Sequence, residues 1–218
     1  MQIIWHGQSF FQIITARAKD APVSLAVDPF SDDLGLRVPS VSADILLITH
    51  DHSDHNNIKA VQGSPFVIDG PGEYEIKDVS IQGIPAVHDK SFGKERGRVT
   101  IYTIVAENIR LCHLADFGQK ELFPEQIEDI GEVDILLIPV GGNYTIDSQA
   151  ASEIISRLEP KIVIPMHYQL PKLKVKLDGL DKFLKIMGEK ASEPLPKLTI
   201  KQKDLPIEGM KTIILRAQ

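Results

Sequence analysis

Apolar residues fall in short runs through the first two-thirds of the chain, and each run ends at a turn or a polar cluster. This pattern is typical of β-strands. The runs at 45–49 and 135–140 are continuously apolar, which predicts strands buried on both faces and covered by helices. The other predicted strands lie at 3–5, 10–15, 24–27, 66–69, 79–87, 99–105, 109–114, 162–165 and 210–215.

Helical periodicity is clearest at 147–158. Asp147 is a suitable N-cap, and Ile154 and Leu158 belong to an apolar stripe with helical spacing. Pro160 ends this helix. A few helices among many strands favour an α+β fold in which two sheets carry helices on their outer faces. Further helices are predicted at 53–61, 123–130 and 178–187.

Length and charge narrow the class of protein. The chain has 218 residues, of which 43% are hydrophobic and 25% charged, so a single globular domain spanning 1–218 is expected. Its formal net charge is −6, which argues against nucleic acid as a partner because phosphates require a basic surface. In the most basic segment, 172–176, lysines alternate with apolar residues, which predicts an exposed strand or a lysine-protected edge.

The single cysteine, Cys112, excludes an intrachain disulfide and lies in an apolar run that predicts a small buried side chain. No segment approaches the roughly 18 apolar residues of a membrane span. The N-terminus has neither a basic region nor a long apolar stretch of the secretory kind. We therefore expect a cytoplasmic protein with no membrane partner, and its oligomeric state stays open, a homo-oligomer included.

Three of the seven histidines lie in the segment Thr-His-Asp-His-Ser-Asp-His, 49–55, directly after a predicted buried strand. Without a cation these rings and carboxylates would crowd one another with no gain in packing, whereas metal coordination gives each a strong partner. Residues two apart at a strand end point the same way, so His50 and His52 can address one ion together. Asp54 and His55 follow where the chain turns, and they suit a second ion nearby. Polar residues that end other apolar runs can complete the ligand set, namely His88, Asp116 and His167.

The order HxHxDH, a lone histidine, an aspartate after a strand and a late histidine resembles the metallo-β-lactamase superfamily over nearly the whole chain. The opening WHGQSFF, the VDPF turn at Asp28 and the loop PVGGNYTID look like the branch of small hydrolases that includes the ascorbate-6-phosphate lactonases. This resemblance implies a four-layer αββα sandwich, in which two mixed β-sheets are flanked by helices and the metals lie at one edge between the sheets.

The resemblance also implies how the ligands divide between two divalent ions. His113 competes with His88 for the place of the third histidine of the first ion, and the longer separation of His88 from Asp116 matches the family order better. Asp28 is implied as a carboxylate that orients the metal-binding loop, with a simple turn-forming aspartate as the alternative. The implied ligands are His50, His52 and His88 for the first ion, Asp54, His55 and His167 for the second, and Asp116 as the bridge.

Imidazoles and carboxylates without a thiolate suit zinc, and they also accommodate iron or manganese. Two ions about 3.5–4 Å apart can share a water and lower its pKa to about 7, so a metal-bridging hydroxide is available near neutral pH. The predicted reaction is its attack on a small, anionic ester, lactone or phosphodiester. The redox di-iron branch of the superfamily has Glu at the position of His52, which favours hydrolysis here. The residues assigned catalytic roles are Asp54, Asp116 and His167.

Substrate contacts are predicted from loops. Asn143 and Tyr144 follow two glycines after a buried strand, and His6 lies in a His-Gly turn after the first strand. Each of them can also be a packed or solvated side chain with no role in binding. A glycine-punctuated segment after His88 holds three cationic candidates for a phosphate group, with solvated surface charge as the alternative, namely Lys90, Lys94 and Arg96.

Two other functions remain as alternatives. One is a metal-binding or sensing protein without turnover, which the full ligand set disfavours. The other is a nuclease acting on RNA or DNA, which the acidic charge and the lack of room for a second, substrate-gripping domain disfavour. A small-molecule substrate is therefore the preferred partner.

Overall fold

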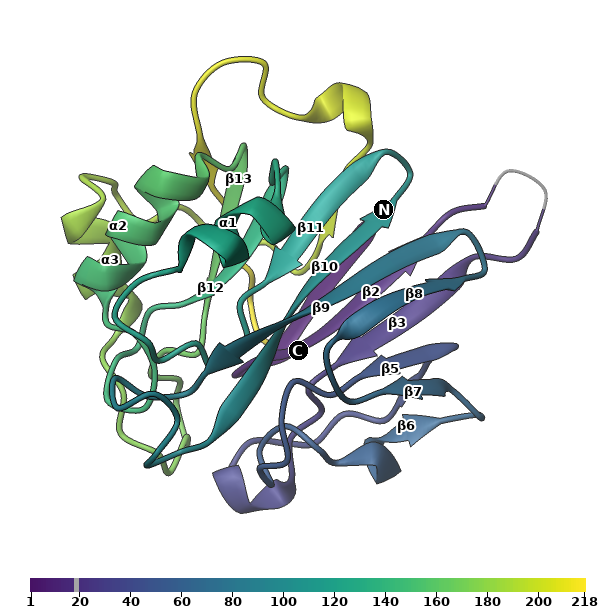
Figure 1. Cartoon of the computed structure of the whole chain (residues 1–218), viewed down its shortest axis with the longest axis horizontal. Helices are drawn as coiled ribbons and strands as arrows, with labels where there is room; N and C mark the ends of the chain where they lie inside the picture. Colours follow the sequence, from purple (N-terminus) through teal and green to yellow (C-terminus); the bar gives the residue numbers. More distant parts are fainter. Residues whose placement is uncertain (18–19) are drawn as a thin grey trace.

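Two β-sheets pack face to face in the computed structural model, which describes residues 1–17 and 20–218 (Figure 1). Each sheet mixes parallel and antiparallel pairs, so the α+β class with two mixed sheets is confirmed. The first sheet has the strand order β14 (Leu198–Thr199), β1 (Gln2–Gly7), β2 (Phe10–Thr15), β3 (Val23–Val27), β5 (Ile45–Leu47) and β7 (Phe66–Ile68). The second sheet has the order β15 (Lys211–Thr212), β13 (Ile162–Met166), β12 (Ile135–Pro139), β11 (Ile109–His113), β10 (Arg98–Ala106), β9 (Val79–Val87) and β8 (Gly72–Ile76).

The α-helices lie beside the second sheet, next to β11, β12 and β13 (Figure 1). In the described part of the chain they are α1 (Pro124–Ile130), α2 (Ser148–Leu158) and α3 (Leu180–Ile186), close to the predicted bounds. α2 begins as predicted, because the Asp147 carboxylate accepts a hydrogen bond from the Ala150 N–H at 2.9 Å. None of these helices has the length and apolar character that a membrane span needs.

The main hydrophobic core lies between the sheets. Trp5 and Phe11 contribute large buried rings from the first sheet. Tyr102 of β10 reaches across the core, and its hydroxyl donates to the Ile48 carbonyl at 3.0 Å. Truncating a buried aromatic side chain of this kind costs about 3–5 kcal/mol. Apolar burial and a cross-sheet hydrogen bond therefore fix the two sheets, and the loops at their ends, relative to each other.

A second hydrophobic cluster covers the outer face of the first sheet, where Phe10 and Leu46 of the strands join Phe30, Leu34 and Leu173 from loops. The covering layer consists of loops, short 3₁₀ turns and a small parallel pair. In the described residues it contains no α-helix, so loops and turns take the place of the outer helices that the family resemblance implies on this face. The small pair is β4 (Val41–Ser42) and β6 (Val61–Gln62).

The helix predicted at 53–61 is wrong, and only Ile58–Ala60 forms a 3₁₀ turn there. The reason is that this segment forms hydrogen bonds with the turn that contains Pro29 and Phe30. The Asn57 N–H donates to the Pro29 carbonyl at 2.9 Å, and the Asn57 side-chain amide donates to the Phe30 carbonyl at 2.9 Å. These bonds replace those of a helix and hold the histidine motif as a series of turns.

The strand predicted at 172–176 is also wrong, because these residues form turns and bends. Leu173 is buried in the second cluster, and the Lys174 N–H donates to the Leu34 carbonyl at 2.9 Å. The alternation of lysine with apolar residues therefore reflects a loop that packs its apolar side chains inward. Conversely, sequence patterning does not predict β8, whose sequence Gly-Glu-Tyr-Glu-Ile is largely polar and forms a sheet edge.

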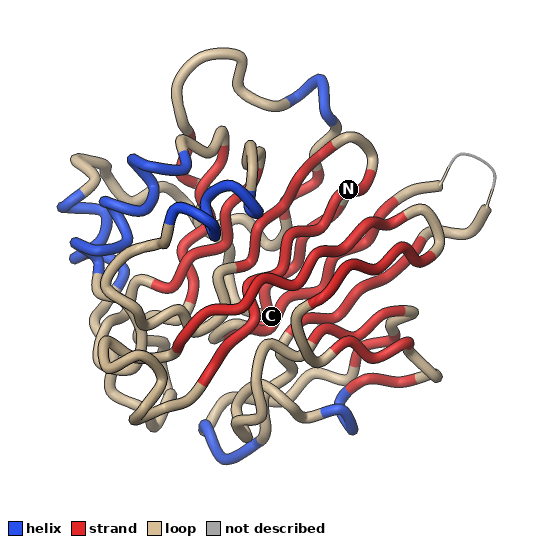
Figure 2. Tube along the Cα trace, in the orientation of Figure 1, coloured by secondary structure: helices blue, strands red, loops and turns tan. Residues whose placement is uncertain are grey.

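Strand direction brings one set of loops to one edge of the fold. β3 and β5 are parallel, as are β11, β12 and β13. β9 runs in the same sense as β11, because both are antiparallel to β10. The Thr100 N–H of β10 donates to the Thr49 carbonyl at 2.9 Å, which ties the loop after β5 to the second sheet. Loops therefore gather at one end of the sheets, where they follow the C-terminal ends of β5, β9, β11 and β13 (Figure 2).

Candidate metal centre

Three histidines converge from the two sheets and form what we call the first ligand group. His50 and His52 follow β5, and His88 follows β9. One nitrogen from each ring lies within 4.8 Å of the others. The ring centroids of His50 and His52 are 4.4 Å apart, and those of His50 and His88 are 4.9 Å apart. Residues far apart in the sequence thus present three imidazoles to one point.

A second ligand group lies beside the first and comprises Asp54, His55, Asp116 and His167, whose ligand atoms also lie within 4.8 Å of one another. Asp116 is central to it. Its Oδ2 lies 3.3 Å from the Nε2 of His55 and 3.3 Å from the Nε2 of His167. The same oxygen lies 3.5 Å from the Nε2 of His88, which belongs to the first group. One carboxylate oxygen therefore contacts histidines of both groups.

The chemistry of these donors fits divalent cations. The two groups contain five imidazoles, two carboxylates and no thiolate. The Nε2 atoms of His50 and His55 are buried and have no hydrogen-bond partner among the described residues. Leaving a buried polar atom unpaired costs about 1–3 kcal/mol. A bound cation would satisfy both nitrogens, so the donor set and its burial agree.

Asp28 sets the protonation pattern of two of these rings. It accepts hydrogen bonds from the Thr49 N–H at 2.8 Å and the Thr49 hydroxyl at 2.7 Å. It also lies 2.8 Å from Nδ1 of His55, which donates to it. The Thr49 hydroxyl donates its proton to Asp28, so its oxygen accepts a hydrogen bond from the Nδ1–H of His50 at 2.9 Å. Both rings therefore carry Nδ1–H, which leaves Nε2 as the atom that faces a metal.

Ser9 plays a similar part for Asp116, and the sequence patterns did not single it out. The Ser9 hydroxyl donates to Asp116 Oδ1 at 3.0 Å, and both residues are buried. This bond occupies one oxygen and leaves Oδ2 facing the histidines. The only sequence signal is the opening WHGQSFF, which carries Ser9 in the turn between β1 and β2.

Electrostatics favours neutral imidazoles at His50 and His88 and ionised carboxylates at Asp54 and Asp116. Burial and the neighbouring His55 lower the pKa of His50 to about 2. Burial opposes ionisation of Asp116, but His167 and His55 outweigh it and hold the pKa of that carboxyl well below its usual range. His55 is the exception. Burial lowers its pKa, but Asp116 and Asp28 outweigh burial and raise that pKa well above normal. Protons and cations therefore compete for His55.

The backbone around the centre adopts the left-handed region at four residues that are not glycine. The φ angles are 47° at Gln8, 51° at Asp28, 54° at Ala115 and 51° at His167. Each such residue costs on the order of 1–3 kcal/mol and persists only where the surroundings enforce it. These residues lie in turns that present site residues, so the fold accepts strain where it directs side chains into the centre.

Two glycines allow the ligand-bearing loops to approach closely. A Cβ at Gly118 would lie 2.2 Å from the carbonyl oxygen of His88. A Cβ at Gly141 would lie 2.2 Å from the carbonyl oxygen of His167. Neither distance is compatible with a side chain, since the obstructing atoms are backbone. Glycine at these positions thus permits the backbone of two ligands to contact neighbouring loops.

Two cavities adjoin the ligands. The first, which we call the metal cavity, has a volume of about 300 Å³ and is lined by His52, Asp54, His88, Asp116 and His167, among others. The second, which we call the polar cavity, has a volume of about 340 Å³ and includes Asp89, Lys90, Asn143 and Thr145 in its lining. His88, Arg96 and Tyr144 line both cavities.

Of the three residues predicted to contact the substrate, two line a cavity beside the metal centre and one does not. Tyr144 lines both cavities and Asn143 lines the polar cavity, where its side-chain amide donates to the Lys176 carbonyl at 2.8 Å. His6 lines neither cavity, and this placement disagrees with its predicted substrate contact. Its ring packs on Phe10 at 4.7 Å, and Phe10 belongs to the second hydrophobic cluster. The reason is strand alternation, because Trp5 of the same strand points into the main core.

His88, and not His113, is the histidine that the structure places with His50 and His52. His113 is fully buried, and its Nδ1 accepts a hydrogen bond from the Ala115 N–H at 3.1 Å. Its Nε2 donates to the Ser9 carbonyl at 3.0 Å. Burial lowers the pKa of His113, so it is a neutral core residue with both nitrogens engaged. Cys112 beside it is buried, and burial raises the pKa of its thiol.

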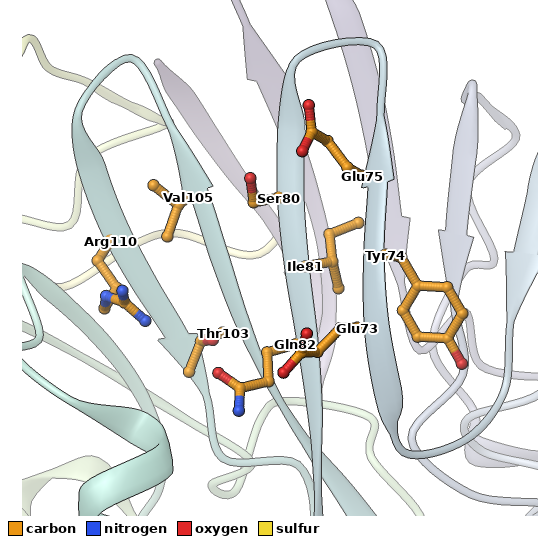
Figure 3. Close-up of a pocket in the computed structure, with 9 residues that line it drawn as sticks. All are labelled: Glu73, Tyr74, Glu75, Ser80, Ile81, Gln82, Thr103, Val105 and Arg110. Atoms are coloured by element: carbon orange, nitrogen blue, oxygen red, sulfur yellow. The ribbon is translucent and has the colours of Figure 1, made fainter.

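A separate pocket of about 350 Å³ lies on the outer face of the second sheet, across β8, β9 and β10 (Figure 3). Glu73, Gln82, Thr103 and Arg110 are among its lining residues, and none of the lining residues is histidine or cysteine. The pocket shares no residue with the metal or polar cavity. The chemistry of the site therefore belongs to the sheet edge and not to this face.

Fold and site together define a metal-dependent hydrolase. The profile of the β-lactamase superfamily domain matches residues 2–167, and the chain belongs to this superfamily, in its metallo-β-lactamase class. A metal-dependent hydrolase of Thermoplasma volcanium is 30% identical over 197 residues, covering 77% of this chain and 83% of that protein. A Pyrococcus abyssi protein, which like the Thermoplasma volcanium protein is described as UPF0173, is 32% identical over 188 residues. The alignment covers 77% of this chain and 83% of that protein.

A solved structure gives the same assignment. It is a candidate Zn-dependent hydrolase of the metallo-β-lactamase superfamily from Thermotoga maritima, with 33% sequence identity and a TM-score of 0.77. The alignment covers 98% of this chain and 97% of that one. The similarity therefore extends over nearly the whole of both chains.

Proposed function

We propose that this hydrolase binds two divalent cations, zinc in preference to iron or manganese, and cleaves a small, anionic ester, lactone or phosphodiester. The observation that carries the proposal is Asp116, whose Oδ2 lies within 3.5 Å of histidines from both ligand groups. A carboxylate in that position is suited to bridge two cations. The description of the Thermotoga maritima protein as Zn-dependent supports zinc.

The roles of the chain's residues follow from their hydrogen bonds. His50, His52 and His88 would hold one cation, and Asp54, His55 and His167 the other, with Asp116 between them. Bound cations would supply a hydroxide nucleophile near neutral pH and stabilise the negative charge that develops on the substrate. Asp28 fixes the tautomers of His50 and His55, and Ser9 orients Asp116, so these ligands need little rearrangement during the reaction.

Asp54 combines binding with a direct role at the reacting centre. It is half-buried and lines the metal cavity. Burial raises its pKa, but His55 outweighs burial and lowers that pKa to about 2. Asp54 is therefore ionised at neutral pH, and it acts as a hydrogen-bond acceptor for the attacking water rather than as a proton donor. The catalytic assignments remain Asp54, Asp116 and His167.

The size of the cavities favours a small-molecule substrate. Ligand pockets typically measure about 300–1,000 Å³, and the metal cavity of about 300 Å³ lies at the lower end of that range. Two cations held by only two carboxylates leave a net positive centre, which attracts an anionic substrate despite the acidic chain.

Metal analysis paired with an activity panel tests the proposal. The panel contains lactones, neutral and anionic p-nitrophenyl esters, bis-p-nitrophenyl phosphate and a short RNA, each tried with zinc-, manganese- and iron-loaded protein. We expect two equivalents of metal and turnover of at least one ester, lactone or phosphodiester. A metal-loaded protein that hydrolyses none of them, or that cleaves only RNA, would overturn the proposed substrate class.

The histidine motif offers a matched pair of variants. Asp54→Asn should lose about one of the two equivalents of metal and most of the activity, whereas Asp51→Asn, in the same turn, should lose neither. Asp51 is exposed and belongs to neither ligand group, and it accepts a hydrogen bond from Asn56. Equal losses in both variants would show that the turn and not the ligand is responsible.

A further inference from the structure

Arg96 occupies an unusual position at the mouth of the site. It lies in the loop between β9 and β10, and its guanidinium carbon is 4.5 Å from the ring centroid of Tyr144, in the loop between β12 and α2. This distance is typical of a cation–π contact. Both residues line the metal cavity and the polar cavity. The pair therefore joins two loops where the two cavities meet.

The Arg96 guanidinium has no carboxylate partner among the described residues. The arginines that form ion pairs there are Arg17 and Arg157. Arg96 is nevertheless half-buried, and a half-buried guanidinium normally finds an anion or carbonyl for its N–H donors. Its contact with the face of the Tyr144 ring restrains the guanidinium without engaging its N–H donors in a hydrogen bond.

The loop that carries Arg96 is rigidly organised by the residue after His88. Asp89 Oδ1 accepts hydrogen bonds from the backbone N–H groups of Ser91 at 2.8 Å and Gly93 at 3.0 Å. Asp89 Oδ2 accepts from the N–H groups of Glu95 at 3.2 Å and Arg96 at 2.8 Å. One carboxylate thus fixes the loop from the ligand histidine to Arg96, so the guanidinium is positioned before any substrate arrives.

The acidic side chains nearby are already engaged. The four bonds to backbone N–H groups occupy Asp89, and Asp147, which lines the polar cavity, accepts from the Ala150 N–H. Glu95 accepts from the Ser91 hydroxyl. By contrast, Arg96 and Lys90 line the polar cavity with no carboxylate within ion-pair distance in the described residues. The N–H donors of Arg96 and Lys90 are therefore the charged donors at the mouth that remain available to an anion.

We propose that Arg96, held against the ring of Tyr144, determines substrate specificity by binding an oxyanion of the substrate that is remote from the bond cleaved. The substrate would place its reacting group in the metal cavity and a carboxylate or phosphate beside Arg96. This inference rests on the proposed function, and it narrows the substrate to a molecule with a reactive end and a separate anionic end. Charge-assisted pairs of guanidinium and oxyanion are strong and directional.

Binding measurements test this without relying on turnover. Isothermal titration calorimetry on zinc-loaded protein would use inorganic phosphate and succinate as separate probes, which distinguishes a phosphate site from a carboxylate site. Arg96→Gln should weaken binding of the preferred probe roughly tenfold or more. Lys94→Gln removes the same charge from an exposed neighbour that lines neither cavity, and it should change binding less than twofold. Zinc content should be the same in all three proteins.

Tyr144 variants separate ring from hydroxyl. Tyr144→Phe keeps the cation–π surface and should bind the probe like the native protein, whereas Tyr144→Leu should weaken binding several-fold. Native protein that binds neither probe, or Arg96→Gln protein that binds as tightly as native, would overturn the proposal. Weakening by Tyr144→Phe equal to that by Tyr144→Leu would overturn the role of the ring.

Kinetics adds a second readout and distinguishes this inference from the proposed function. For p-nitrophenyl succinate, which has a remote carboxylate, Arg96→Gln should raise KM with little change in kcat. For p-nitrophenyl butyrate, which is neutral, KM should not change. Equal losses on both esters would make Arg96 a structural residue. Absence of turnover on every substrate, with probe binding that depends on Arg96, would contradict the hydrolytic substrate class and leave the oxyanion site supported.

Discussion

Asp116 of the second ligand group contacts histidines of both groups, but the two groups differ in their surroundings. The first group offers three imidazoles, and burial lowers the pKa values of His50 and His88, so these rings stay neutral and ready for a cation. The second group adds carboxylates, and Asp116 and Asp28 raise the pKa of His55 well above normal. His50 and His88 therefore resist protonation, whereas His55 attracts a proton. A site of this kind should fill its two positions with different affinities and different pH dependence.

Removing the shared residue should have the largest effect. Asp116→Ala takes away the oxygen that contacts histidines of both groups. We expect loss of both cations and a fall in kcat/KM of at least about 10³-fold, beyond the roughly 10–100-fold typical of partners outside the ligand shell. Metal analysis by mass spectrometry and steady-state kinetics would measure this, with Asp51→Asn as the control. Full metal content in Asp116→Ala would contradict the bridging role.

Ligands that belong to one group should separate the two positions. His52→Ala and Asp54→Ala remove half-buried residues from the first and second groups, respectively. Each variant should retain about one equivalent of metal, and activity should fall by roughly 10²–10³-fold, a range comparable to removal of one electrostatic contact to the transition state. Identical loss of both equivalents in the two variants would mean that the groups act as one indivisible site.

Asp28 should matter less than a ligand and more to the second group. Asp28→Ala removes the acceptor that fixes Nδ1–H of His55, and through Thr49 that of His50. Metal affinity should fall roughly 10–100-fold. The direct bond to His55 predicts that the position containing His55 weakens more. Calorimetric titration with zinc, resolved into two binding steps, measures this, and equal weakening of both steps would contradict the difference.

The smallest effect concerns acid stability and His6. The buried His6 ring has no hydrogen-bond partner in the described residues, and burial lowers its pKa from 6.5 to about 4. In the unfolded chain His6 takes up a proton below pH 6.5, whereas in the folded protein it stays neutral down to about pH 4. The free energy of unfolding is therefore unaffected by His6 above pH 6.5 and decreases as the pH falls from 6.5 towards 4. His50, His88 and His113 act in the same direction.

Metal-free protein should therefore unfold at lower urea concentration at pH 5 than at pH 7. His55 acts in the opposite sense, since its raised pKa adds stability below pH 6.5 that is lost as the pH rises through the folded value. His6→Leu should reduce the acid-side loss by about 1–2 kcal/mol at pH 5, at about 1.4 kcal/mol per pKa unit, and should leave activity unchanged. A large loss of activity in His6→Leu would restore His6 to the substrate site.

The convergence of the candidate ligands was predictable from sequence because several of them end a run with a strong pattern. His50, His88 and Asp116 follow apolar strands, and strand direction alone brings strand ends to a common edge. The choice of His88 over His113 rests on the resemblance to the order of residues in the metallo-β-lactamase superfamily. The loops that cover the outer face of the first sheet were harder to predict from sequence. The hydrogen bonds of Asn57 to Pro29 and Phe30 replace those of a helix, and they depend on tertiary contacts.

The supporting residues were least visible in the sequence. Ser9, Thr49 and Asp89 are common polar residues whose roles depend on which group lies within hydrogen-bond distance. Arg96 was one of three cationic candidates in its segment, and only the cavities and the stack on Tyr144 distinguish it from Lys94. The position of His6 depends on which face of β1 meets the core, and a single polar residue in a short strand does not reveal that.

A crystal of zinc-loaded protein, with anomalous diffraction recorded at the zinc absorption edge, tests the central claim most directly. We expect two peaks, one enclosed by His50, His52 and His88 and the other by Asp54, His55 and His167, with the Asp116 carboxylate between them. An anomalous map with no peak among these residues, or with its peaks elsewhere on the molecule, would contradict the account.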